Sequence, residues 1–254
     1  MATLIDTRPS SVRVEMRILG APLPAAPRAP RPYDRIKAAT DFAIGTTLLV
    51  ITFPAVIVAA IAIKSTSRGR VIYSQLRVGR DGRLFNIFKL RTMYDNCEAV
   101  SGPRWSKLGD TRITPVGRFL RRLHIDELPQ LWNVLCGDMS LVGPRPERPE
   151  FVVPLQQAIP GYSERLFVKP GVTGLAQIQR PPDSTIESVR EKLLLDRCYV
   201  NRYGLWLDLR ILIGTALYLA GVSYAGVRRL LRLPNGVSES GLNASMPSPS
   251  LVNV

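Results

Sequence analysis

An acidic pair, Asp126 and Glu127, lies within a strongly basic stretch of the chain that runs from Gly117 to Glu147. The arginines of this stretch that lie nearest in sequence to the pair are Arg118, Arg121, Arg122 and Arg145. A carboxylate can attack phosphorus or ligate a metal, and guanidinium groups bind phosphate oxygens bidentately. The segment therefore carries the groups that phosphoryl chemistry on an anionic substrate requires.

A surface ion pair is the alternative explanation for Asp126. We expect one helix over residues 114–132, and on it Arg122 and Asp126 are four residues apart and can pair. The arginines outnumber the carboxylates around them, however, and this surplus favours a site that receives phosphate oxygens. On a helix, adjacent side chains point about 100° apart, so one of the two acids can attack while its neighbour helps to hold a metal or orient the substrate.

Two other segments could complete the site. Pro144 and Pro146 flank Arg145 and restrict its backbone, so they either present its guanidinium rigidly or form an ordinary proline-rich turn. Lys89 and Arg91 lie in an alternating apolar and polar segment that predicts a strand. They add two phosphate-binding cations, unless they merely form a solvated strand face.

The composition restricts the partners and the metal. Thirty-four Lys and Arg residues against 20 Asp and Glu give a formal net charge of +14 and a pI near 10.3. This excess indicates an anionic partner: nucleic acid, an acidic membrane surface or a phosphorylated substrate. The chain has one histidine, so we expect any metal to be a hard, oxygen-bound ion such as Mg²⁺.

Residues 42–63 carry no charged side chain. As a helix this run would be roughly 33 Å long, enough to cross a bilayer core of about 30 Å. Pro54 interrupts it, and basic residues flank both ends, which places both ends in the cytoplasm. We therefore predict a re-entrant membrane hairpin over residues 33–64, with its break at Pro54, rather than a full span.

The remaining segments suggest the domain boundaries. Residues 1–32 are rich in proline and arginine and are expected to be a disordered basic lead-in, and residues 235–254 a disordered tail. Residues 65–234 are expected to form one domain. A second uncharged run, 211–227, is short for a span and favours an interfacial helix with a basic end. The predicted fold class is α+β, mainly helical, with short strands and interfacial amphipathic helices.

The sequence resembles the bacterial sugar transferase family, the monotopic phosphoglycosyl transferases, over residues 37–226. The segments that carry the resemblance are KAATDFAIG, VIYSQLRVGRDGRLFNIFKLRTM, DTRITPVGRFLRRLHIDELPQLWNVLCGDMSLVGPRPERPEF, VKPGVTGLAQI and REKLLLDRCYVNRYGLWLDLRIL. DELPQ followed by GPRPE at this spacing is very specific. The C-terminal segments are similar to the exopolysaccharide-type branch.

The resemblance implies a role for each candidate residue. Asp126 would be the nucleophile and Glu127 its partner, with both near Mg²⁺ at the substrate diphosphate. The residues that fall on the family's basic positions are Lys89, Arg91, Arg121 and Arg145. Pro144 and Pro146 would complete its Pro-Arg-Pro motif.

The resemblance also implies the substrates and the location. The family moves a sugar-1-phosphate from a UDP-sugar to undecaprenyl phosphate, which starts exopolysaccharide, capsule or O-antigen synthesis. The expected partners are these two substrates, membrane lipids and other polysaccharide-assembly proteins, with no nucleic acid. The expected location is the cytoplasmic face of the inner membrane.

Two rival functions are compatible with the residues. The charge would suit a membrane-tethered nucleic-acid-binding protein, although the arginines cluster around acids rather than along an aromatic face. An inactive scaffold for polysaccharide assembly is the other rival, and the intact acidic pair argues against it.

Overall fold

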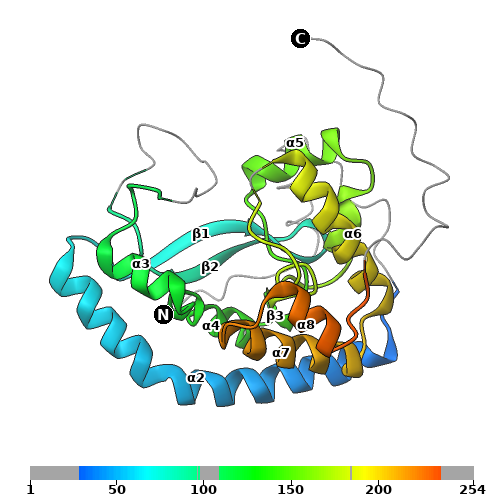
Figure 1. Cartoon of the computed structure of the whole chain (residues 1–254), viewed down its shortest axis with the longest axis horizontal. Helices are drawn as coiled ribbons and strands as arrows, with labels where there is room; N and C mark the ends of the chain where they lie inside the picture. The colour runs from blue at the N-terminus through cyan, green and yellow to red at the C-terminus, as the bar shows by residue number, and fades with distance from the viewer. Residues whose placement is uncertain (1–28, 96, 98–108, 184, 236–254) are drawn as a thin grey trace, which may run out of the picture.

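The computed structural model of the chain describes residues 29–95, 97, 109–183 and 185–235, and over these residues the fold is mainly helical (Figure 1). The strands of this part are short and form two separate two-stranded sheets. This agrees with the mainly helical α+β prediction. The predicted disordered ends, residues 1–32 and 235–254, fall almost entirely outside the described residues.

A single long helix, α2 (Pro32–Thr66), runs along one edge of the molecule beneath α3, α4 and α7 (Figure 1). Pro32 occupies its first turn, where a missing N–H costs nothing, and Asp34 accepts a hydrogen bond from the Arg31 backbone at 3.0 Å. By length and composition this helix could cross a membrane.

The predicted hairpin over residues 33–64 is not what the structure shows. Pro54 lies inside α2 and the helix continues past it to Thr66 without reversing. Proline removes one hydrogen bond and bends a helix, but the hydrogen bonds on either side can hold the axis together. Just before Pro54, the Thr52 side-chain hydroxyl donates to the Leu48 carbonyl, one turn earlier in the helix, at 2.7 Å.

Polar bonds hold α2 to the rest of the protein at both of its ends. Near the N-terminal end, the Lys37 ammonium donates to Asp208 of α7 (Leu205–Leu219) at 2.7 Å, and the Asp41 carboxylate accepts from the Leu141 backbone at 3.2 Å. At the C-terminal end, Arg91 donates to the carbonyl of Ser67 at 2.9 Å. The helix therefore lies along the domain rather than projecting away from it.

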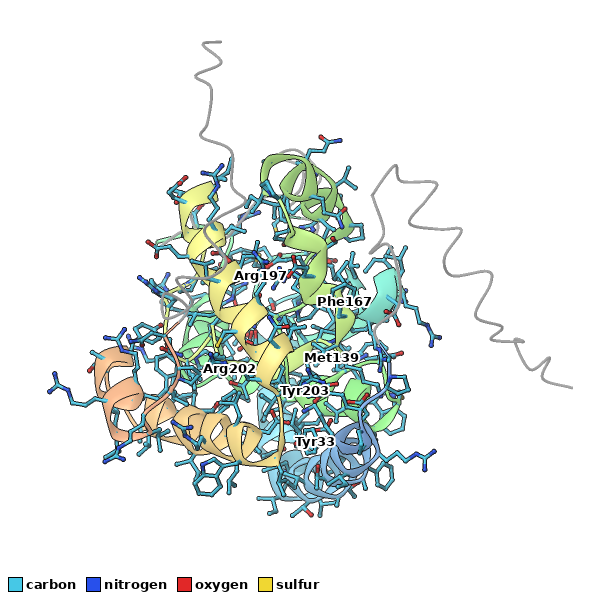
Figure 2. The ribbon with its side chains drawn as sticks, turned by 90° about the vertical axis from the view of Figure 1, so that its right-hand side faces the viewer. Tyr33, Met139, Phe167, Arg197, Arg202 and Tyr203 are labelled. Carbon is cyan, nitrogen blue, oxygen red and sulfur yellow. The ribbon has the colours of Figure 1, made fainter. Side chains whose placement is uncertain are left out.

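Asp208 is the centre of the first of these anchors. Its carboxylate also accepts hydrogen bonds from the hydroxyls of Tyr33 and Tyr199, each at 2.8 Å. Tyr203 at the end of α6 (Ile186–Arg202) lies beside Tyr33, with ring centroids 6.0 Å apart (Figure 2). A buried carboxylate that accepts from two hydroxyls and an ammonium is well satisfied, so this junction of α2, α6 and α7 is well defined.

The predicted strands form a hairpin of β1 (Ile72–Val78) and β2 (Leu84–Leu90), antiparallel, with Ile72 opposite Leu90. The turn between them is the short helix η1 (Arg80–Gly82). Asp81 and Gly82 both have positive φ angles there, which is the backbone that an Asp-Gly turn favours. Lys89 lies near the end of β2.

The expected single helix over residues 114–132 is broken into three pieces: α3 (Pro115–Arg122), η2 (Ile125–Glu127) and α4 (Gln130–Leu135). His124 has a φ of +55°, a left-handed conformation that ends α3. Pro129 then has no N–H for the carbonyl of Ile125, so the next helix begins only after it. The acidic pair consequently lies on a one-turn 3-10 helix between two α-helices.

The second sheet pairs β3 (Ser140–Val142) with β4 (Gly171–Thr173) in parallel. The crossover between them contains α5 (Pro149–Ala158) and η3 (Tyr162–Phe167). The main core packs β2, β3, α4, α6 and α7 together, and a second cluster packs α5, η3 and α6. β3 thus lies at the centre of the domain and its C-terminal end leads into the Pro-Arg-Pro segment.

The uncharged run 211–227 is not one helix. α7 ends at Leu219, and α8 (Tyr224–Leu230) begins after a turn in which Gly221 has a φ of +92°. Fifteen residues of α7 are about 22 Å long, too short to cross a bilayer core.

Large apolar side chains are exposed along α2, α3, α4, α7 and α8. Those more than half exposed on these helices are Ile36, Phe42, Val50, Ile51, Phe53, Val58, Ile61, Phe119, Trp132, Leu205, Trp206, Leu219 and Leu230. A soluble monomer rarely exposes so much apolar surface on neighbouring elements.

We predict that Lys37→Met lowers the stability of the protein in detergent by about 3 kcal/mol, because it leaves the buried Asp208 carboxylate without its cation. Lys64→Met changes the exposed lysine at the other end of the same helix and should have almost no effect. Equilibrium unfolding followed by tryptophan fluorescence measures both. Equal stability of the two variants would contradict the role given to the anchor.

Candidate active site

Three elements bring their side chains together around the acidic pair. η2 carries Asp126 and Glu127, β2 carries Lys89, and the loop after β3 carries Arg145. The sequence predicted all four residues, and the structure joins three of them by direct contacts. The segments that meet here are separated by up to 56 positions in the chain, so their meeting depends on the whole fold.

Glu127 is held by two cations. One carboxylate oxygen, Oε1, accepts from the Lys89 ammonium at 2.7 Å and from the Arg145 guanidinium at 2.6 Å. The other, Oε2, accepts from Arg145 at 3.3 Å. Burial alone would raise the pKa of Glu127, but Arg145 and Lys89 outweigh it and hold that pKa well below its usual value. Glu127 is therefore a fixed anion whose two oxygens are already engaged.

Asp126 has the opposite environment. Its side chain is buried, yet within the described residues its carboxylate accepts no hydrogen bond and forms no direct ion pair. Burial, together with the charge of Glu127, raises its pKa, while the more distant Lys89 and Arg121 oppose the rise. Two adjacent carboxylates whose pKa values are driven apart are suited to different chemical roles. Asp126 is the one that remains available to a ligand.

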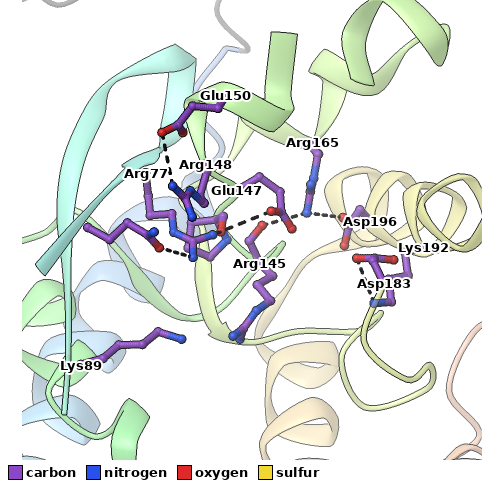
Figure 3. A network of polar contacts seen from close by, with 12 residues as sticks. Arg77, Lys89, Arg145, Glu147, Arg148, Glu150, Arg165, Asp183, Lys192 and Asp196 are labelled. Carbon is purple, nitrogen blue, oxygen red and sulfur yellow. Dashed lines mark hydrogen bonds and ion pairs between the residues drawn. The ribbon is translucent and has the colours of Figure 1, made fainter. Parts of the chain in front are cut away.

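The Pro144–Glu147 segment fixes the position of Arg145. All four backbone carbonyls in it accept hydrogen bonds: Pro144 from the Gly171 backbone, Arg145 from Arg165, Pro146 from Arg77, and Glu147 from the Val78 backbone, at 2.8 to 2.9 Å. Figure 3 shows Arg77 and Arg165 on opposite sides of this segment, and the Arg145 side chain extends from the segment toward Lys89. The segment cannot shift without breaking bonds to β1, β4 and η3.

The glycines of the GPRPE and KPGVTG sequences allow this close packing. A Cβ atom on Gly143 would lie 2.4 Å from the Lys169 carbonyl, and one on Gly171 would lie 2.1 Å from the Gly143 nitrogen. Such distances exclude any side chain. The sequence motif is thus explained by backbone contact between two loops.

The Asn133 side chain positions Lys89, because it forms the hydrogen bonds with the β2 backbone that a neighbouring strand would form. The Asn133 amide of α4, buried at 1% exposure, donates to the Asn86 carbonyl at 2.7 Å and accepts from the Phe88 backbone at 3.1 Å. It fixes the free edge of β2 just before Lys89. Burial lowers the pKa of the Lys89 ammonium, and Glu127 opposes that effect.

Arg121 and Arg91 lie differently from Lys89 and Arg145. Arg121 donates to the Thr92 hydroxyl at 2.8 Å, and its pKa is lowered by burial against an opposing effect of Asp126. Arg91 is buried and donates to the carbonyls of Ser67 and Arg68 and to the Ser67 hydroxyl. The structure therefore directs Arg91 to the end of α2, whereas Arg121 remains near Asp126.

The donor set fits a divalent ion that arrives with a phosphate ligand. Among the described residues, no group of three or more His, Cys, Asp and Glu side chains could hold a metal alone. Mg²⁺ typically takes only one or two protein carboxylates and fills its shell with water and substrate phosphates. Asp126 has an unengaged carboxylate that suits this arrangement, and Glu127 is adjacent to it.

Sequence reasoning missed the residues that support the site. Arg77 and Arg165 read as ordinary surface cations, and Asn133 as an unremarkable helix residue. Their roles depend on contacts 20 to 69 positions away along the chain. Arg77 has no acidic residue within three positions in sequence, whereas Arg165 directly follows Glu164, so no shared local signal marks them.

Comparison with known proteins identifies the family. The sequence model described as bacterial sugar transferase matches residues 32–221. Relatives include a UDP-N-acetylgalactosamine-undecaprenyl-phosphate N-acetylgalactosaminephosphotransferase of Aeromonas hydrophila, 40% identical over 72% of this chain and 43% of that protein. A UDP-glucose:undecaprenyl-phosphate glucose-1-phosphate transferase of Caulobacter vibrioides is 39% identical over 83% of this chain and 77% of its own length.

A third relative is an exopolysaccharide production protein of Rhizobium leguminosarum bv. phaseoli, 36% identical over 71% of this chain and 92% of that protein. The chain spans less than half the length of several other relatives that it matches, as it does for the Aeromonas protein.

We predict opposite effects on stability for the two acids, measured at pH 7 without substrate or metal. Glu127→Gln should lower the free energy of unfolding by about 2 kcal/mol, because it leaves Lys89 and Arg145 without their anion. Asp126→Asn should leave it unchanged or raise it, because burial disfavours the charged form of Asp126. A destabilised Asp126→Asn protein would show that this carboxylate has a structural partner.

Proposed function

Because the chain belongs to the bacterial sugar transferase family, we propose that it transfers a sugar-1-phosphate from a UDP-sugar to undecaprenyl phosphate through an intermediate on Asp126. The observation that carries this proposal is the contrast within the acidic pair. Glu127 is engaged by two cations, while the adjacent Asp126 is buried and unpaired within the described residues. An unpaired carboxylate beside phosphate-binding cations is suited to attack phosphorus.

The proposed reaction has two displacements. In the first, an Asp126 oxygen attacks the β-phosphorus of the UDP-sugar, the bond from that phosphorus to the bridging oxygen breaks, and UMP leaves with the electron pair. This forms an acyl-phosphate linkage to the sugar phosphate. In the second, a phosphate oxygen of undecaprenyl phosphate attacks the same phosphorus, and the Asp126 carboxylate is released.

The cations around Glu127 have a defined part in both steps. Lys89 and Arg145 are fixed by Glu127 and can share their remaining donors with the diphosphate, where negative charge develops as the bond breaks. Arg145 is 41% exposed, so its guanidinium is accessible to a ligand from the side opposite Glu127. Arg121 is close enough to affect Asp126 and would receive another phosphate oxygen.

Mg²⁺ would be held by Asp126 and Glu127 together with the substrate phosphates, and when bound it would neutralise charge on the diphosphate. The protein residues alone are too few to hold the ion, so its binding should depend on substrate.

The apolar surface along α2, α3, α7 and α8 would contact the inner membrane. α2 is anchored to the domain at both ends, so its exposed apolar face would lie in the cytoplasmic leaflet while the domain stays in the cytoplasm. The lipid-linked acceptor would then approach from this surface. By analogy with the exopolysaccharide production protein of Rhizobium, the product would begin exopolysaccharide, capsule or O-antigen synthesis.

We predict that wild-type protein incubated with a sugar-labelled UDP-sugar, but without acceptor, retains label that hydroxylamine removes. Asp126→Asn should retain none and should release UMP at least about 10³-fold more slowly, since Glu127, the adjacent carboxylate, is engaged by Lys89 and Arg145. Glu164→Gln changes a carboxylate in the 3-10 helix η3, where Glu164 pairs with Arg197, and should behave as wild type. Full turnover by Asp126→Asn would refute the assignment.

Removal of Mg²⁺ with EDTA should stop UMP release, and added Mg²⁺ should restore it, because the diphosphate charge would otherwise be shared by Lys89, Arg121 and Arg145 alone. The UMP-release assay over a panel of UDP-sugars with undecaprenyl phosphate measures this. Unchanged turnover in EDTA would exclude the metal from the mechanism.

A further inference from the structure

A shallow recess, partly open to solvent, lies on the side of Arg145 away from Lys89 (Figure 3). The polar residues that line it are Arg145, Glu147, Tyr162, Arg165, Gln177, Asp183, Lys192 and Asp196. Because Arg145 also contacts Glu127, the recess adjoins the proposed diphosphate site.

Asp183 and Lys192 form a pair at this recess. The Lys192 ammonium lies 3.1 Å from the Asp183 carboxylate, and their side chains are 16% and 18% exposed. The other Asp183 oxygen accepts from the Ser188 hydroxyl at 3.3 Å. An ammonium and a carboxylate held side by side offer both donors and acceptors to neighbouring hydroxyl groups.

Two deeper groups have fixed roles of their own. Asp196 is 3% exposed and pairs with Arg165 at 2.9 Å, so it maintains the support of Arg145. The Gln177 amide nitrogen donates to the Val172 carbonyl at 3.0 Å, while its side-chain oxygen is buried without a donor among the described residues. A buried acceptor without a partner is uncommon, and a ligand hydroxyl could satisfy it.

The lining suits a hexose better than a nucleobase. Bases usually stack on aromatic faces. Tyr162 is the aromatic residue here, but it is 2% exposed, its hydroxyl accepts from Arg165, and that guanidinium covers its ring at 5.1 Å. The other polar groups of the lining are carboxylate, ammonium, amide and guanidinium, which can all bond to sugar hydroxyls. The sugar is also the part of the donor joined directly to the phosphorus that Asp126 would attack.

We propose that this recess binds the hexose of the UDP-sugar and that Asp183 and Lys192 determine which hexose is accepted. The inference rests on the proposed function and adds to it the place where donor selectivity arises. Asp183 and Lys192 contact sugar hydroxyls, whereas Asp196 and Arg165 act only through the position of Arg145.

The test compares Asp183→Asn and Lys192→Met with wild type in UMP release from UDP-glucose, UDP-galactose and their 2-acetamido forms. KM for the preferred donor should rise about tenfold, the preference among donors should narrow, and inhibition by UMP should stay unchanged. Lys192→Arg keeps the ion pair and should retain more of the preference. Arg180→Met and Glu191→Gln are matched controls, because they break an exposed pair, 2.9 Å apart, that also reaches α6.

Three other outcomes would overturn the proposal. Weaker inhibition by UMP in Asp183→Asn or Lys192→Met would assign the recess to the nucleotide and overturn the proposal. An unchanged preference and KM in both variants, with wild type active, would overturn it while leaving the proposed function intact. If wild type released UMP from no donor, the proposed function would fail and the hexose assignment with it.

Discussion

The site depends most on the restraint of one extended segment, Pro144–Glu147. Its carbonyls are bonded to β1, β4 and η3, so Arg145 reaches Glu127 from a backbone that is held on several sides. The guanidinium then fixes Glu127, and Glu127 fixes Lys89. Because Lys89 and Arg145 donate to Glu127 rather than to Asp126, the Asp126 carboxylate remains unpaired within the described residues.

The position of α2 follows from a similar restraint. Asp208 and the Asp41 contact hold one end, and Arg91 holds the other, so both ends lie on the domain side. The sequence argument from basic flanks placed both ends in the cytoplasm, and that orientation stays a prediction. A helix held at both ends can only offer its outer face to lipid, and that face carries the exposed apolar side chains of α2.

Local patterns predicted the chemistry of the site but not its geometry. The acidic pair, Arg145 and the β1–β2 hairpin could be read from residue types and alternation over short windows. The break at η2 could not, because it requires a left-handed His124 as well as Pro129, and a lone proline near a helix start is common. At Pro54 the sequence predicted a break that the structure does not have, because anchors at both ends keep α2 continuous. Asn133 and Arg165 act through partners far away in sequence, which no window contains.

The acidic pair lies between two different surfaces. Exposed Leu123 lies two residues before η2, and Trp132 follows η2 on α4, so the apolar surface begins within a turn or two of Asp126. The His124 ring lies edge-on to the ring of Tyr218 of α7, with the ring centroids 6.1 Å apart. This contact connects the apolar surface to α7 and α8. On the other side, Arg145 leads to the polar recess at Asp183 and Lys192. In the proposed reaction, a soluble donor and a lipid-linked acceptor would therefore reach the same carboxylate from opposite sides, and a covalent intermediate would let the two substrates use it in turn.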